Sequence, residues 1–154
     1  PDAPMRVVAA CTILSADLEA AQSLTLAGPS DPTVVRFEDD GSGYFLALAS
    51  DPDTPITKPY SSEPFRVVFG EGDHGSLEGL TLEVVQLSGT ELAFTALGRL
   101  VQSDDVWIRV SGAEDELGVH VRAATGSVSI VQASAIPSGG PQPVGGGGPQ
   151  PISL

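Results

Sequence analysis

Residues 106–124 read VWIRVS-GAEDE-LGVHVRAA, two runs of alternating apolar and polar residues on either side of an acidic turn. Val106, Ile108 and Val110 would share one face of the first run, as Leu117 and Val119 would in the second. Alternation with a period of two is typical of strands that bury one face. This stretch therefore predicts a β-hairpin, and the rest of the predicted fold is built around it.

Similar alternating runs continue on both sides of this hairpin. A single helix is predicted over residues 15–24, where Ser15 is a suitable N-cap and Asp17 and Glu19 lie in the first turn. Residues 51–64 contain four prolines, which central strands do not tolerate, so they predict a surface loop or an edge segment. The predicted strands are residues 6–14, 33–38, 44–50, 65–69, 80–87, 91–101, 106–111, 117–124 and 127–135.

Strands at this spacing, with turn sequences between them, favour an antiparallel architecture over βαβ units. We therefore predict an all-β fold: an antiparallel β-sandwich, jelly roll or barrel of about eight strands with at most one short helix. Residues 1–135 would form this domain. Residues 136–154 are rich in glycine and proline and would form an extended tail without a core of its own.

The tail contains a repeat of five residues. GPQPV at 140–144 recurs as GPQPI at 148–152, with a run of glycines between the two copies. Proline favours the extended polyproline II conformation, so each copy can present its side chains to a partner, and the alternative is a plain linker. The candidate interface residues in the tail are Pro141, Pro143, Val144, Pro149, Pro151 and Ile152.

The charge is strongly unbalanced, with seven basic and twenty acidic residues and a net charge of −13. Such a surface repels nucleic acid and anionic membranes, and no apolar run reaches the ~18 residues of a bilayer span, so neither partner is expected. The lone Cys11 lies in a run that reads as a buried strand. One thiol and no visible leader predict synthesis in a reducing cytosol.

Catalytic and metal-binding patterns are missing from the sequence. His74 and His120 have no second histidine or thiol at a ligand spacing. Acidic pairs such as Asp39-Asp40 and Asp104-Asp105 lie in predicted turns, which their side chains stabilise. We therefore expect no enzyme activity, no metal and no cofactor.

One surface grouping emerges from the hairpin at residues 106–124. If the turn places Gly112 opposite Leu117, the outward face carries Trp107, Arg109, His120 and Arg122, with a possible cation–π contact between Trp107 and Arg122. Tryptophan and arginine are enriched at protein interfaces. These four residues are the candidate interface on the domain.

No family motif is visible, and the functional prediction depends on the predicted fold, the charge and the tail. A non-enzymatic structural protein is expected, an accessory component of a bacteriophage particle such as a head decoration (cement) or tail protein. Its partners would be copies of itself or a larger lattice such as a major capsid protein, and its location the virion. The alternative is an extracellular adhesive or carbohydrate-binding β-sandwich module that carries a Gly/Pro linker.

Overall fold

The structure is a computed structural model that describes residues 3–138. Its first element is one continuous helix, α1 (Ala3–Ala27), which is 25 residues long. The predicted strand at residues 6–14 is therefore wrong, and the predicted helix at residues 15–24 is only its second half. The alternation of Val7, Ala9, Cys11 and Ile13 misled the prediction because this segment is apolar on every side, so it has no clear helical period.

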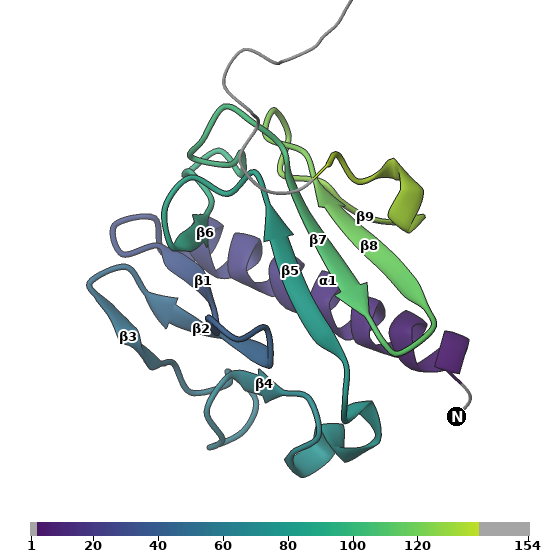
Figure 1. Cartoon of the computed structure of the whole chain (residues 1–154). Helices are drawn as coiled ribbons and strands as arrows, with labels where there is room; N and C mark the ends of the chain where they lie inside the picture. Colours follow the sequence, from purple (N-terminus) through teal and green to yellow (C-terminus); the bar gives the residue numbers. More distant parts are fainter. Residues whose placement is uncertain (1–2, 139–154) are drawn as a thin grey trace, which may run out of the picture.

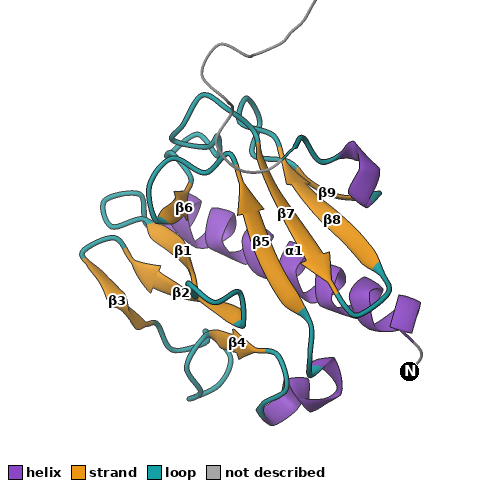
Figure 2. Ribbon diagram, in the orientation of Figure 1, coloured by secondary structure: helices purple, strands orange, loops and turns teal. Residues whose placement is uncertain are grey.

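The remaining described chain forms two antiparallel sheets and two short 3-10 helices, η1 (Gly72–Leu77) and η2 (Ala133–Ala135). Figure 2 shows the two sheets beside the single long helix. The strands of the first sheet are β1 (Thr33–Phe37), β2 (Gly43–Leu48), β3 (Asp51–Pro55), β4 (Arg66–Val68) and β6 (Glu91–Ala93). Those of the second sheet are β5 (Thr81–Val85), β7 (Val106–Ser111), β8 (Glu116–Val121) and β9 (Val128–Val131).

The strand orders are β3-β2-β1-β6 in the first sheet, where β4 also pairs with β2, and β5-β7-β8-β9 in the second. The helix contacts β1 from the first sheet and β7, β8 and β9 from the second, and it runs behind the second sheet in Figure 1. At the junction of the sheets, the amide of Leu82 in β5 donates to the carbonyl of Gly41, between β1 and β2, at 2.9 Å. The helix therefore unites two sheets that share few backbone bonds.

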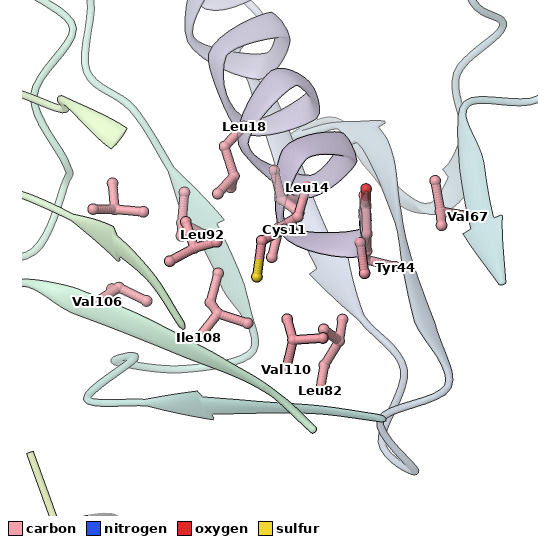
Figure 3. Packing of buried hydrophobic residues seen from close by; sticks show 14 of the residues in the cluster. Cys11, Leu14, Leu18, Tyr44, Val67, Leu82, Leu92, Val106, Ile108 and Val110 are labelled. Atoms are coloured by element: carbon pink, nitrogen blue, oxygen red, sulfur yellow. The ribbon is translucent and has the colours of Figure 1, made fainter. Parts of the chain in front are cut away.

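The core lies between the helix and the two sheets. Cys11, Leu14 and Leu18 project from α1 toward Ile108 of β7 and Leu92 of β6, as Figure 3 shows, and all five are at most 1% exposed. Burial of a leucine-sized side chain stabilises a fold by roughly 1.5–3 kcal/mol. The sheets and the helix therefore depend on one another, because neither buries its apolar face alone.

Polar contacts fix the angle of the helix across the sheets. The hydroxyl of Tyr44, which is fully buried in β2, donates to Oδ2 of Asp17 at 2.7 Å. Five residues further along the helix, Nε2 of Gln22 donates to the carbonyl of Gly98 at 2.7 Å. These bonds attach α1 to the first sheet and to the loop between β6 and β7.

The all-β prediction is therefore wrong: the fold is α/β, with a long N-terminal helix packed on antiparallel sheets. Two predicted hairpins are confirmed, at residues 33–50 as β1–β2 and at residues 106–124 as β7–β8. The proline-rich segment also forms an edge strand, β3. Local alternation identified these strands, but it gave no account of the helix that covers them.

The helix also bears on the expectation that no segment spans a bilayer. By length and composition, the helix at Pro4–Ala27 is long and apolar enough to span a bilayer. Core helices of globular proteins meet the same criterion, and in this structure Val7, Ala10, Leu14 and Leu18 are buried against the sheets. Length and apolar character are therefore shared by a membrane span and by a core helix.

Candidate functional site

The outer face of the second sheet, turned away from α1, carries an aromatic stack. Trp107 of β7 lies directly opposite His120 of β8, and their rings are parallel, with centroids 3.7 Å apart. Trp107 is half-buried, while His120 is only 6% exposed. The pair therefore forms a flat, rigid element of this face and leaves part of the indole ring accessible.

Asp105 completes this cluster. Its Oδ2 lies 2.8 Å from Nε2 of His120, and its Oδ1 accepts the amide hydrogen of Ala123 at 2.8 Å. These bonds hold the pKa of Asp105 below its usual value, the amide of Ala123 first and His120 second, and the charge of Arg122 contributes further. The carboxylate thus ties the start of β7 to the end of β8.

Sequence reasoning missed the role of Asp105, which it interpreted only as a turn former. It also paired the hairpin two residues out of register. The structure places Trp107 opposite His120 and Arg109 opposite Gly118. A Trp107–Arg122 contact is therefore replaced by the Trp107–His120 stack, and only the correct register would have revealed it.

The two arginines of the predicted patch differ in their surroundings. Arg109 forms ion pairs with Glu83 at 3.1 Å and Glu116 at 3.2 Å, so its charge is neutralised within the chain. Arg122 is exposed and lies near Asp105. The interface role of this patch remains a prediction. The six predicted tail residues, Pro141, Pro143, Val144, Pro149, Pro151 and Ile152, lie outside the described residues.

A second candidate surface is the exposed face of α1, which we call the helix stripe. Its residues recur every three or four positions, so they share one side of the helix. Three are large and apolar: Met5, Val8 and Leu26 are 60%, 49% and 49% exposed. The helix stripe consists of Met5, Val8, Thr12, Ala16, Glu19, Ser23 and Leu26.

The helix stripe is unusual for this chain because it carries a single charge, that of Glu19. A solvated helix face in an acidic protein normally carries many charges. Small residues such as Ala16 and Ser23 also let another helix approach closely. This face has the composition of a helix–helix contact.

A third feature is an open groove of about 420 Å³ beside β4. It is lined by Lys58, Arg66 and His74 together with Glu63, Glu71 and Asp73. Arg66 is paired with Glu38 at 3.0 Å, and Lys58 lies 3.9 Å from Glu63. The groove carries both signs of charge and has no evident ligand preference. In residues 3–138 no three His, Cys, Asp or Glu side chains converge as metal ligands.

No protein-family model matches the sequence, and no curated protein matches it either. The fold, however, resembles that of the type IV minor pilin FimU of Pseudomonas aeruginosa strain PAO1, solved in two crystal forms. In the first form the TM-score is 0.58 at 18% identity, with 86% of this chain and 93% of that chain covered. In the second the TM-score is 0.56 at 18% identity, with 85% and 97% covered.

This likeness defines the fold class as that of a type IV pilin, and it corrects the functional prediction. The bacteriophage decoration or tail protein and its virion location were inferred from a β-sandwich or jelly roll, and the pilin-like fold overturns both. The alternative of an extracellular adhesive or carbohydrate-binding β-sandwich module lacks support for the same reason. The long helix that was missed in the sequence is the element that separates these classes.

Proposed function

We propose that this protein is a pilin-like subunit that assembles, without catalysis, into a filament of the type IV pilus class at the cell surface. The observation that carries the proposal is the long helix with one face buried under two sheets and the other exposed and nearly free of charge. The similarity to a type IV minor pilin over most of both chains supports the same role.

In this proposal the helix stripe is the assembly surface. An acidic chain with a net charge of −13 repels its own copies unless the contact lies where charge is sparse. The helix stripe satisfies this condition, and the exposed Met5, Val8 and Leu26 would become buried against neighbouring helices. The two sheets would then face outward and form the surface of the filament.

The test is a charged residue in the middle of the helix stripe. Ala16→Arg places a large cation at an exposed position, so the fold should persist while helix–helix contact is blocked. We expect the wild-type chain to be recovered in filaments sheared from its native cells. At equal cellular levels, the amount of A16R recovered in these filaments should be lower by about tenfold or more. Ser62→Arg, in an exposed loop, is the matched control.

Two results would contradict this proposal. One is recovery of A16R in sheared filaments at the wild-type level, which would show that the helix stripe makes no contact. The other is absence of the wild-type chain from the filament fraction while it accumulates as a free protein.

A further inference from the structure

Strand β9 is the last strand of the second sheet, and its outer edge has no neighbour in the described chain. The amide of Arg122 donates to the carbonyl of Ser127 at 3.0 Å, and hydrogen-bonded pairs alternate in an antiparallel ladder. In the register of β8 and β9, the backbone groups of Ser129 and Val131 thus form hydrogen bonds to β8. The backbone groups of Val128 and Ile130 point away from it, toward the open edge.

This edge lacks the usual protection against strand pairing. Natural proteins block exposed edges with charged residues or prolines, as β3 of this chain does with Pro52 and Pro55. The sequence of β9 is VSIV, without a charge or a proline. Ser129 is exposed and Ile130 is 43% exposed, so η2 leaves the edge accessible.

The distribution of charge indicates what binds there. All seven basic and all twenty acidic residues precede Ala123, so the chain from that residue onward is uncharged. Two copies of such an acidic chain can therefore approach through this region with little repulsion. The partner that this edge suits best is therefore a second copy, joined strand to strand.

We propose that two copies pair through the open edges of their β9 strands, antiparallel, to join their two four-stranded sheets into one continuous sheet. The pairing that uses every free backbone group places Val128 opposite Ile130 of the partner subunit. Ser129 then lies opposite the partner subunit's Ser129, in a pair without hydrogen bonds. This contact is separate from the helix stripe and goes beyond the proposed function.

The geometry allows a direct test by cross-linking. Residues in such a pair have Cα atoms about 4.5 Å apart, which a disulfide can span. Ser129→Cys should form a covalent dimer under mild oxidation. A non-reducing gel detects this dimer. Native Cys11 is fully buried, so it does not compete. Ser62→Cys, also exposed but far along the chain, should give no covalent dimer.

A second variant tests the contact without a covalent bond. Light scattering of the wild-type chain should give twice the 15.7 kDa of one copy. Ile130→Lys adds a protecting charge at the edge and should weaken dimerisation by about tenfold or more, whereas Thr90→Lys, in an exposed turn, should not. A far-ultraviolet spectrum and melting temperature like those of the wild type show that I130K is folded.

A wild-type chain that stays monomeric, or S62C that cross-links as fast as S129C, would overturn this inference. Filament incorporation distinguishes a failure of the β9 contact from a failure of the proposed function. If I130K loses the dimer but still enters sheared filaments, both proposals stand. If the wild type forms no dimer yet enters filaments, only the β9 contact is refuted.

Discussion

At the scale of single residues, the fold shifts the pKa values of two aspartates in opposite directions. Burial raises the pKa of Asp17, although the hydroxyl of Tyr44 and the charges of Lys58 and His74 oppose the change. Hydrogen bonds from Ala123 and His120 lower the pKa of Asp105. Because a shifted pKa couples protonation to folding, the two residues should contribute opposite slopes to the dependence of stability on pH.

Asp17→Asn should become more stable relative to the wild type as pH rises from about 3 to 7. The contribution of a carboxyl with a raised pKa is present below its unfolded pKa and lost as pH rises through the folded one. The amide oxygen of asparagine can still accept the hydrogen bond from Tyr44, without a charge to bury. Urea unfolding at several pH values measures the difference in free energy.

Asp105→Asn is the matched control for this measurement. Its stability deficit should be largest at neutral pH and should shrink as pH falls through the lowered pKa of Asp105, since protonation then removes the wild-type advantage. Parallel pH profiles for the two variants would contradict the assigned environments.

At the scale of elements, α1 has two faces with different tasks. The buried face holds the sheets, whereas the helix stripe is open to other molecules. Because apolar residues occur on both faces, neither task can be assigned from the sequence of the helix alone. Stability and assembly should therefore respond to different substitutions in the same helix.

Leu14→Ala should lower the free energy of unfolding by about 2–5 kcal/mol, because the leucine is fully buried between helix and sheets. Val8→Ala, on the helix stripe, should change it by less than about 0.5 kcal/mol, because that side chain is 49% exposed. Chemical denaturation of both variants checks the orientation of the helix. Equal losses would show that α1 is rotated about its axis.

At the scale of the whole molecule, the chain ends its described part on the outer face of the second sheet. Ile136 is 7% exposed and covers Gly118, where an added Cβ would lie 2.7 Å from the isoleucine Cδ1. This contact fixes the end of the described chain on the side of the second sheet away from α1.

Deletion of residues 139–154 should leave the melting temperature unchanged, because every residue of the described hydrophobic core precedes this segment. Deletion of residues 133–154 also removes Ile136 and should cost about 1–3 kcal/mol. Calorimetry of the two truncated chains separates the contribution of the Ile136 contact to stability from that of the repeats. If the shorter deletion lowers filament incorporation at unchanged stability, the predicted docking role of the tail is supported; unchanged incorporation would remove it.

The sequence by itself determined the hairpins β1–β2 and β7–β8, the edge position of the proline-rich β3, and the excess of acidic over basic residues. These features depend on neighbours in the chain: alternation, turn residues and proline act over a few positions. Only the tertiary structure decided that residues 3–27 are one helix, because a segment apolar on every side fits a strand or a helix until its covering sheets are known. It also decided the pairing register that stacks Trp107 on His120, because a shift of two residues keeps Val106, Ile108 and Val110 on the buried face and leaves the alternation unchanged.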